Sequence, residues 1–524
     1  MSSATSVDFA AAAAVLPHKE NLRFILGLKL SRLRKARELS FKDLSERTGL
    51  TTSYLNEIEK GKKYPKPEKI AALANALGTS YDELVSLQLG PQLDRLAALL
   101  KSGLLQALPL HVFGLSPADL VAIASSDPER ISALFDTLLT IARRFDVKMD
   151  DLLLAAMRSY VEQNHNYFED LEVSSEAFRA AHGWPRRATP DMKQLRTCLI
   201  KEYKYSIDDT MLATHPDLQR LRAVSTNGDS RRLYLNSRLS EWQQAFLVAR
   251  EIGARYLGLN PGPTTSPLVK VESYPQLIDN FRASYFAGAL LLNRTLLEGD
   301  LRRFFSLARW EGEVLVAILE KYQSTPEMLF HRLTQILPRL FALEQMYFIR
   351  FDRRLGTPHV SIGKELQYHG IHGTHSIKDE EHYCRRVLAV QALLSLEAGG
   401  LANGPIVHAQ RTRDHATDEE FFNLSVTYSQ GPGSDVLSCV SIGFRVDEAL
   451  KRMLAFWNDS AVPSRVVGST CERCPLTDCA ERAAAPVLHA KTERRQREIE
   501  AIAALAAIGA ASGVDRRGSE GMKE

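Results

Sequence analysis

The sequence predicts a mainly α-helical protein with an α+β C-terminal region. Apolar residues recur at intervals of three and four along residues 21–170, which is the period of amphipathic helices. Between residues 340 and 460, short runs rich in β-branched and aromatic residues, such as FNLSVTYSQG, end in turn residues and are typical of strands. A chain of 524 residues has room for about two to four domains.

Bulk composition excludes several classes of protein. Hydrophobic residues make up 45% and charged residues 25% of the chain, which is typical of a soluble globular protein. No apolar run reaches the roughly 18 residues of a membrane-spanning helix, so we expect no membrane association. The Ala-rich start, DFAAAAAVLPH, lacks the basic region of a signal peptide and is interpreted as an arm. Six cysteines are too few for a disulfide scaffold of this length and predict a reducing, cytoplasmic location.

Changes in composition divide the chain into six segments. Breaks such as HGWPRRATPD, and shifts from helical to strand-like patterns, set their limits. We expect a disordered arm at 1–20, a compact helical domain at 21–90, a helical linker or dimerisation region at 91–185, a mixed domain at 186–335, an α+β region with a cysteine cluster at 336–487, and a charged helix with a disordered tail at 488–524.

Residues 21–90 carry the start and stop signals of short helices. Ser40 is a good N-cap, Gly49 stands where a tight turn must form, and Thr51 caps a third helix. Pro67 is the expected first residue of a fourth helix, and TSYDEL begins a fifth. Two short helices joined by a glycine-containing turn form a helix-turn-helix.

The segment DLSERTGLTTSYLNEIEKGKKYP resembles the Cro/phage-repressor (XRE) family, whose five-helix DNA-binding domain is lambda-repressor-like. The resemblance spans about 60 residues and implies that the third helix enters the major groove of double-stranded DNA. It places short hydroxyls and an amide against base edges, and lysines against phosphates. The implied DNA-binding residues are Thr51, Thr52, Ser53, Tyr54, Asn56, Lys60, Lys62 and Lys63, with Lys66 nearby.

Basic charge is concentrated in the same segment. Residues 21–90 hold thirteen Lys and Arg against eight Asp and Glu, a net of +5, whereas the whole chain has a net charge of +3. A basic patch beside a recognition helix indicates phosphate binding. Because one such domain binds DNA weakly, we expect a homodimer on two half-sites. The alternative function is a helix-turn-helix protein that binds only a protein partner.

The segment FLVAREIGARYLG, residues 246–258, has the outline of a zinc-peptidase helix without its histidines. With the flanking RRLYLNSRLS and YFAGALLLN, it resembles the ImmA/IrrE metallopeptidase-like family. Arg250 and Ala254 stand at the two histidine positions of H-E-x-x-H, and only Glu251 remains of the motif. An arginine cannot bind Zn²⁺, because its guanidinium stays protonated. We therefore expect no catalytic residues, and a metallopeptidase is the disfavoured alternative.

Three of the six cysteines stand together as Cys471-x-x-Cys474-x4-Cys479. In a reducing compartment, this spacing indicates a structural Zn²⁺ or an iron–sulfur cluster more than a disulfide. The other interpretation is free cysteines in a proline-containing turn. A fourth ligand must come from elsewhere in the chain. The candidates are Cys439, which we place first, Cys384 and His382.

Taken together, the helix-turn-helix, the ImmA/IrrE-like segment and the C-terminal C-x-x-C-x4-C-x-x-RA resemble the short-chain fatty acyl transcriptional regulators over most of residues 25–490. The resemblance implies a dimeric transcription factor that senses a short-chain acyl-CoA or related metabolite and controls genes of carbon and fatty-acid metabolism. Some members hold an iron–sulfur cluster at these cysteines, although Phe444 replaces a further cysteine of the family here. Residues 340–460 would form a GAF/PAS-like sensor, whose ligand-binding residues the sequence does not indicate.

Overall fold

The computed structural model describes residues 18–86 and 149–518, apart from short gaps, and the single residues 137, 140 and 144. The gaps are residues 186–187, 227–230, 260–263, 267–270, 272, 368–380, 397–403 and 431–433. Residues 1–17 of the predicted arm, 91–136 of the predicted linker and 519–524 of the predicted tail lie outside the described residues. The chain divides into two compact units, Met1–Tyr160 with Leu268–Asp279 and Val161–Pro267 with Asn280–Glu524.

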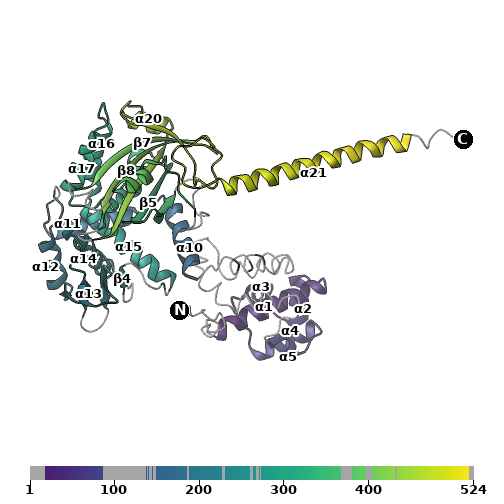
Figure 1. Cartoon of the computed structure of the whole chain (residues 1–524). Helices are drawn as coiled ribbons and strands as arrows, with labels where there is room; N and C mark the ends of the chain where they lie inside the picture. Colours follow the sequence, from purple (N-terminus) through teal and green to yellow (C-terminus); the bar gives the residue numbers. More distant parts are fainter. Residues whose placement is uncertain are drawn as a thin grey trace. The chain divides into compact units, whose positions relative to one another are not determined.

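The N-terminal domain is helical, as the sequence predicts (Figure 1). Ser40 and Asp43 form a capping box at the start of the second helix, and Gly49 ends that helix in the left-handed conformation at φ 69°. Leucines from each helix meet in one core. The first helix begins inside the segment that we expected to be a disordered arm. The helices are α1 (His18–Ala36), α2 (Phe41–Thr48), α3 (Thr52–Glu59), α4 (Pro67–Ala76) and α5 (Tyr81–Val85).

The middle of the chain combines helices with a small sheet. The sheet has the strand order β1-β3-β2-β4, in which β3 pairs in parallel with β1 and antiparallel with β2. The elements are α10 (Met149–Gln163), α11 (Glu169–Ala181), α12 (Met192–Lys201), β1 (Ser206–Asp208), α13 (Met211–Thr214), β2 (Ala223–Thr226), β3 (Arg232–Leu235), α14 (Glu241–Tyr256), β4 (Thr264–Ser266) and α15 (Tyr274–Leu291).

Helix α14 lies at the centre of this region and packs against α12 and α15. Leu247 and Ile252 of α14 belong to one buried cluster with Leu195 of α12 and Phe286 of α15. Gly253 allows the close approach of α14 and α15, because a Cβ there would lie 2.6 Å from Cδ1 of Phe286.

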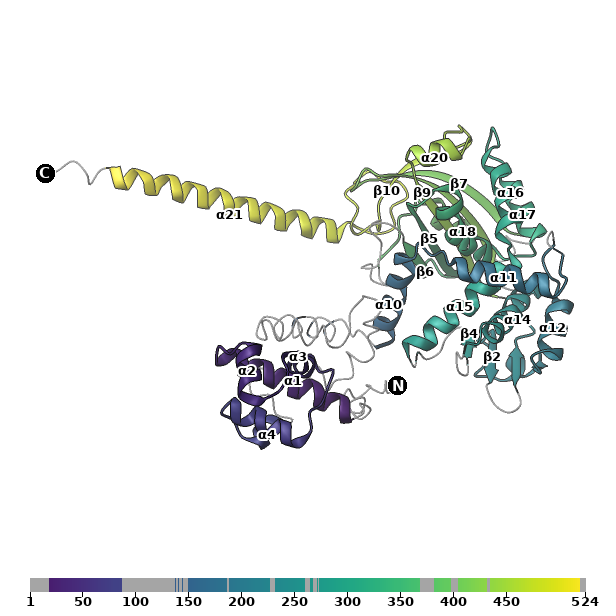
Figure 2. The same cartoon turned by 180° about the vertical axis from the view of Figure 1, so that it is seen from behind.

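The C-terminal region is a six-stranded sheet with helices on both faces (Figures 1 and 2). Its strand order is β10-β7-β8-β9-β5-β6, antiparallel except that β10 runs parallel to β7. The elements are α16 (Arg294–Phe305), α17 (Gly312–Lys321), α18 (Pro326–Phe341), β5 (Met346–Arg354), β6 (Val360–Gln367), α19 (Leu388–Ser395), β7 (Ile406–Asp414), β8 (Glu420–Ser429), β9 (Val436–Arg445), α20 (Glu448–Met453), β10 (Ser464–Val467) and α21 (Val487–Gly518).

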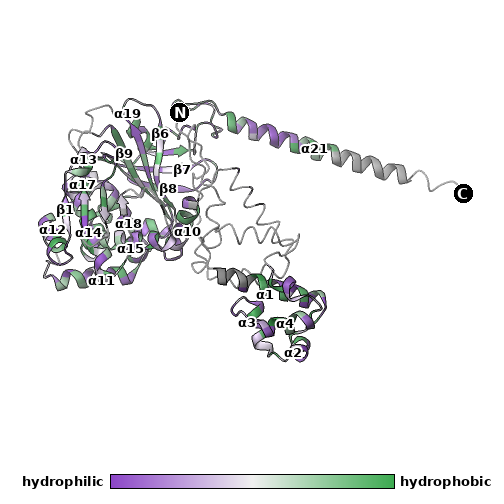
Figure 3. Cartoon of the chain, turned by 90° about the horizontal axis from the view of Figure 1, so that it is seen from below, coloured by the Kyte–Doolittle hydropathy of each residue, from purple (hydrophilic) through white to green (hydrophobic). Residues whose placement is uncertain are grey.

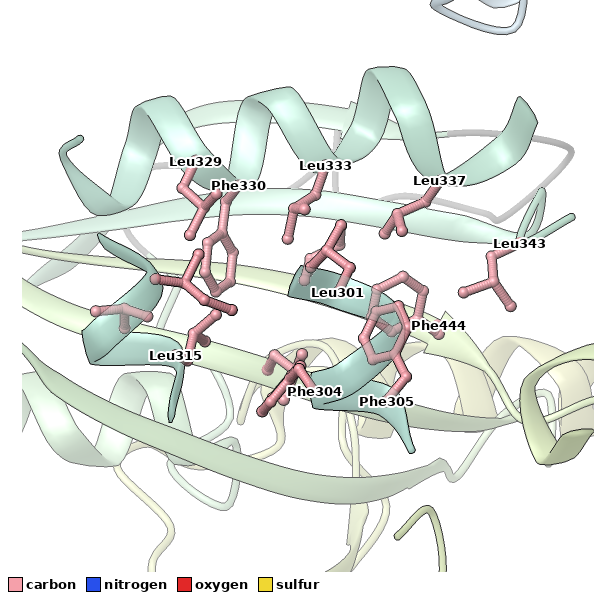
Figure 4. Close-up of a cluster of buried hydrophobic side chains, with 14 of the residues drawn as sticks. Leu301, Phe304, Phe305, Leu315, Leu329, Phe330, Leu333, Leu337, Leu343 and Phe444 are labelled. Atoms are coloured by element: carbon pink, nitrogen blue, oxygen red, sulfur yellow. The ribbon is translucent and has the colours of Figure 1, made fainter. Parts of the chain in front are cut away.

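The largest core lies between this sheet and helices α16, α17 and α18. Figure 4 shows Leu329, Leu333 and Leu337 along one side of α18, facing Phe304 of α16 and Phe444 of β9. Apolar residues at spacings of three and four explain why α18 lays one face on the sheet. Helix α19 covers the opposite face, where its own apolar residues pack with β5 and β9.

Helix α18 runs through the limit that we expected between residues 335 and 336. It is one continuous helix. Its buried residues share one core with the C-terminal sheet and with α16 and α17, which the sequence had assigned to the domain at 186–335. The four strands expected from the sequence correspond to β5, β6, β8 and β9, whereas β7 and β10 were not expected. β10 is only four residues long. The sequence of β7 has a polar character because Arg411 and Arg413 stand at alternating positions in it.

Helix α21 extends the predicted charged helix to Gly518. Its polar stretch at residues 491–498 appears as a purple segment in Figure 3. None of the described helices combines the length and the apolar character needed to cross a membrane.

Candidate functional site

The first turn of α3 presents polar side chains to solvent. Thr51 is its N-cap, and the Thr51 hydroxyl accepts a hydrogen bond from the backbone N–H of Tyr54 at 3.3 Å. Thr52 and Ser53 are exposed, and Asn56 is half-buried one turn further on. Leu55 and Ile58 are fully buried on the other side of the helix. The helix therefore offers small hydrogen-bonding groups at the end that the sequence predicts to read bases.

Tyr54 lies beneath two lysines. Lys69 Nζ is 4.3 Å and Lys63 Nζ is 5.7 Å from the centre of the Tyr54 ring. Lys63 also pairs with Glu57 at 2.8 Å, and this hydrogen bond raises the pKa of Lys63. Part of the Lys63 charge is therefore already neutralised, whereas Lys60 and Lys62 are exposed.

Two of the cations counted in this domain are structural. Arg34 forms a two-pronged contact with the buried Glu59, through Nε to Oε1 at 2.6 Å and Nη2 to Oε2 at 3.0 Å. Lys29 Nζ donates to the carbonyl oxygens of Glu83 and Ser86 at 2.6 and 2.7 Å. These two side chains tie α1 to α3 and to the end of α5. The pair of Arg34 and Glu59 is neutral, so only Lys29 lowers the net charge available to DNA, from +5 to +4.

On α14, the residues at the positions of the zinc-peptidase motif make other interactions. Arg250, Glu251 and Ala254 are all buried. Glu251 accepts hydrogen bonds from the hydroxyl of Ser225 at 2.8 Å and of Tyr205 at 3.4 Å, and Arg250 lies 3.4 Å from its other oxygen. The one remaining residue of the peptidase motif thus links α14 to β2, and the two histidine positions of the motif hold Arg250 and Ala254.

Four cysteines line one small pocket: Cys384, Cys471, Cys474 and Cys479. A single antiparallel bridge between Tyr383 and Thr470 brings the two segments together. Next to it, the N–H of Cys384 donates to Ser469 O at 3.1 Å and the N–H of Cys471 donates to His382 O at 2.9 Å. Among the candidates for a fourth ligand, the structure therefore brings Cys384 to the other three.

Cys439, which we placed first, lies elsewhere. It is fully buried in β9, where it packs with Phe351 and with α19, and Thr427 donates to its sulfur at 3.3 Å. Burial raises the pKa of the Cys439 thiol to about 12. His382, the third candidate, holds Glu472 through Nδ1 at 2.8 Å.

Donors, cations and one carboxylate surround the four cysteines. The carboxylate is Glu481, to which the Cys479 thiol donates at 3.6 Å. The N–H of Ala483 donates to Cys471 Sγ at 3.3 Å. Arg386 and Arg482 also line the pocket, and their buried Nε atoms have no hydrogen-bond partner within the described part of the chain. Burial raises the pKa of the Cys384 thiol, while backbone N–H groups of Gly468 and Arg386 act in the opposite direction. Donors and cations around thiolates are what a thiolate-bound metal requires.

A second group of metal-ligand side chains escaped the sequence analysis. His182, Cys198 and Glu202 place one ligand atom each within 4.8 Å of the others. Cys198 lies in α12 and Glu202 is the C-cap of that helix, so their spacing of four residues places them near one face. We did not predict this helix from the sequence and therefore missed the pair.

Two segments of the chain match known protein families. Residues 25–87 match the family of helix-turn-helix domains, and residues 210–334 match the family of IrrE N-terminal-like domains. The second match confirms the resemblance to the ImmA/IrrE family and includes α14, although the two histidine positions hold Arg250 and Ala254.

Two individual proteins are similar to parts of the chain. A solved structure described as a Mycobacterium tuberculosis transcriptional regulator is 18% identical, covers 63% of this chain and 92% of its own, and has a TM-score of 0.43. An uncharacterized HTH-type transcriptional regulator of Sinorhizobium fredii is 33% identical over 66 residues, which are 13% of this chain and 86% of that protein. This relative and the match to helix-turn-helix domains agree with the capped helix α3. The chain therefore belongs to the HTH-type transcriptional regulators.

Proposed function

We propose that the chain is a sequence-specific regulator that binds double-stranded DNA as a homodimer and responds to a short-chain acyl-CoA or a related metabolite. The observation that carries the DNA-binding part is the first turn of α3. Thr51 caps the helix, Thr52 and Ser53 are exposed at its start, and Lys60 and Lys62 follow it. Small hydroxyls can read base edges, while lysines bind phosphates of any sequence.

The sensor part is assigned to the C-terminal sheet. Strands β7, β8 and β9 are consecutive neighbours in this sheet, and the two earlier strands, β5 and β6, follow beside β9. This strand order supports a GAF/PAS-like domain. Beside it, Arg350 and Lys364 approach Glu327 of α18 at 3.0 and 3.8 Å, and Arg222 adds a third cation. Asp352 also pairs with Arg350, at 3.1 Å, so three cations face two carboxylates. The remaining positive charge would suit the phosphates of a CoA ester.

Cys384, Cys471, Cys474 and Cys479 would hold an iron–sulfur cluster or a structural Zn²⁺. Among the described residues, these sulfurs do not form a group whose ligand atoms all lie within 4.8 Å. A single tetrahedral zinc brings its sulfurs within about 3.8 Å of one another, since each Zn–S bond is about 2.3 Å. The wider spacing favours a cluster, which would add redox sensitivity to the sensor.

Helix α21 supports the dimer. Ile499, Ile502 and Leu505 recur at every third position and are 52%, 66% and 68% exposed. Exposed apolar residues on one face of a helix are stabilised by a partner helix, and a second copy of α21 supplies one of identical sequence.

The test of the proposal has two arms on the full-length protein. Selection of bound sequences from a random DNA pool should yield a motif with two half-sites about one or more helical turns apart. Addition of acetyl-, propionyl- or butyryl-CoA should then shift both the affinity for that motif and the unfolding midpoint, whereas free CoA should not. Enrichment of no sequence would favour a protein-binding role for the helix-turn-helix. Sequence-specific binding without a response to any of the three esters would remove the sensor part alone.

A further inference from the structure

His182, Cys198 and Glu202 converge between the end of α11 and one face of α12. His182 is the C-cap of α11, and Cys198 and Glu202 are one helical turn apart. The distance from His182 Nε2 to the two oxygens of Glu202 is 3.0 and 3.1 Å, and to Cys198 Sγ it is 3.9 Å. All three ligand atoms lie within 4.8 Å of one another.

The imidazole of His182 is held in place from behind. Its Nδ1 lies 2.8 Å from the carbonyl oxygen of Phe178, and its ring stacks on the Phe178 ring with 4.0 Å between centres. A backbone carbonyl can only accept, so Nδ1 carries the proton of the neutral ring and Nε2 presents its lone pair. That lone pair faces a carboxylate, an arrangement that is favourable only when a cation lies between them. The cation is either a proton on Nε2 or a metal ion.

The buried Cys198 distinguishes these two cases. A histidine–glutamate ion pair needs no third partner, but a thiol completes the donor set that zinc takes in proteins. A tetrahedral zinc with bonds of about 2.1 Å to nitrogen and oxygen and about 2.3 Å to sulfur separates its ligand atoms by about 3.4–3.6 Å. The nitrogen–oxygen distances of 3.0 and 3.1 Å are shorter than the tetrahedral value, and the nitrogen–sulfur distance of 3.9 Å is longer. Shifts of about 0.3–0.4 Å would bring each pair to the tetrahedral separation. A histidine whose other nitrogen donates to a backbone carbonyl is the common second contact of a metal ligand.

We propose that His182, Cys198 and Glu202 form a divalent-metal site of the zinc class, separate from the C-terminal cysteines. The three ligands line a hollow of about 360 Å³, so the fourth coordination position opens to solvent. Lys193 and Lys201 line the same hollow, and their charge would favour an anion or a water molecule as the fourth ligand.

A metal there would fix the end of α11 to α12. Phe178, on which His182 stacks, packs edge-to-face with Phe286 of α15 at 5.7 Å and with Tyr256 of α14 at 5.0 Å. The site is therefore attached to the core of the IrrE-like region, in which the peptidase metal position is lost.

The experiment uses the full-length protein, stripped of metal with a chelator and titrated with Co²⁺, whose thiolate and d–d absorption reports a bound cysteine. All variants carry Cys471→Ser and Cys474→Ser, which remove two of the four thiols of the cysteine site so that the new site is the source of the signal. We expect one equivalent of Co²⁺ per chain with a thiolate band. Cys198→Ser should remove the band, and Glu202→Gln should weaken binding at least about tenfold. Glu241→Gln makes the same carboxylate-to-amide change at an exposed residue of α14 outside the hollow, and it should bind as the parent does.

Glu202 also provides a variant that keeps the site and destroys the ion pair. Its side chain is 48% exposed, so a substitution there leaves the buried core intact. Glu202→His replaces the carboxylate by a second imidazole, which binds zinc or cobalt equally well but cannot pair with a protonated His182. Retained cobalt binding in Glu202→His, with loss in Cys198→Ser, supports the metal site. Absence of a thiolate band in the parent, or a band that Cys198→Ser leaves unchanged, overturns it.

Discussion

Arg332 of α18 and Glu172 of α11 form a fully buried, two-pronged ion pair. The distances are 2.6 Å from Nη1 to Oε1 and 2.7 Å from Nη2 to Oε2, and each side chain is 1% exposed. The hydroxyl of Tyr285 donates a further hydrogen bond to Glu172 at 2.8 Å. Because removal of one partner leaves the other charged and buried, this pair ties the helix before the IrrE-like region to the helix that covers the C-terminal sheet.

We predict that Glu172→Ala lowers the free energy of unfolding by about 3–5 kcal/mol. The double variant Glu172→Leu with Arg332→Leu should recover most of that loss, since no charge is left unpaired. Denaturant unfolding followed by tryptophan fluorescence measures the change, because all four tryptophans lie between residues 184 and 457. The matched control on the same helix is Asp170→Ala, which breaks an exposed pair with Arg282 and should cost less than about 1 kcal/mol. Equal losses in the two single variants would contradict the prediction.

Glu327 makes the stability of the C-terminal unit depend on acid pH. Burial alone would raise the pKa of this carboxyl, but Lys364, Arg350 and Arg222 outweigh it and hold the pKa at about 2. The unfolded carboxyl titrates near 4.3, so its contribution is complete above about pH 4.3 and disappears as the pH falls towards 2. The difference corresponds to roughly 3 kcal/mol. We expect Glu327→Gln to flatten the loss of unfolding free energy between pH 5 and pH 2, and parallel curves for the two proteins would refute this.

Base contacts and phosphate contacts should separate on α3. Ser53→Ala and Asn56→Ala should relax sequence preference, each by about 1–3 kcal/mol if a base contact is lost. Lys62→Ala should instead weaken binding to every sequence alike and lower the slope of log affinity against log salt by about one. Fluorescence anisotropy with specific and unrelated duplexes at several salt concentrations distinguishes the two patterns. Identical behaviour of all three variants would mean that α3 does not lie in the groove as we infer.

The cysteines provide a matched pair of variants. Cys384→Ser removes a thiol from the pocket that Cys471, Cys474 and Cys479 line, and Cys439→Ser changes an equally buried thiol in β9. After anaerobic purification, we expect Cys384→Ser to lose the bound metal or the cluster absorbance and Cys439→Ser to keep it. The reverse result would restore Cys439 as the fourth ligand. A colourless protein with stoichiometric zinc would identify the site as structural zinc.

Gly253 and Gly299 test the close packing of α14. A Cβ at Gly253 would lie 2.6 Å from Phe286 Cδ1, so Gly253→Ala should destabilise the protein by about 1–3 kcal/mol. Gly299 is exposed in α16 and its Cβ would meet nothing within 4 Å. Gly299→Ala should therefore stabilise the helix by up to about 1 kcal/mol. Opposite shifts of the unfolding midpoint are expected, and a neutral Gly253→Ala would show that the two helices can move apart freely.

The local features of the DNA-binding domain could be predicted from the sequence, because each depends on residues close together in the chain. The N-caps at Ser40 and Thr51, the turn at Gly49 and the start of α4 at Pro67 all lie where the sequence indicates. A cap is one side chain bonded to a backbone group three residues away, so its signal survives in a short window. The missing histidines on α14 are likewise a property of the sequence alone.

Only the tertiary structure decided which distant residues meet. The charge count could not show that Lys29 and Arg34 bond within the domain, nor that Glu172 finds Arg332 160 positions away. The same holds for the fourth cysteine: from the sequence we placed Cys439 first, whereas one bridge between Tyr383 and Thr470 brings Cys384 to the site. The sequence by itself thus determined the helices and their chemistry, while contacts between distant segments, which depend on how the sheet and helices pack, determined the ligand sets and the ion pairs.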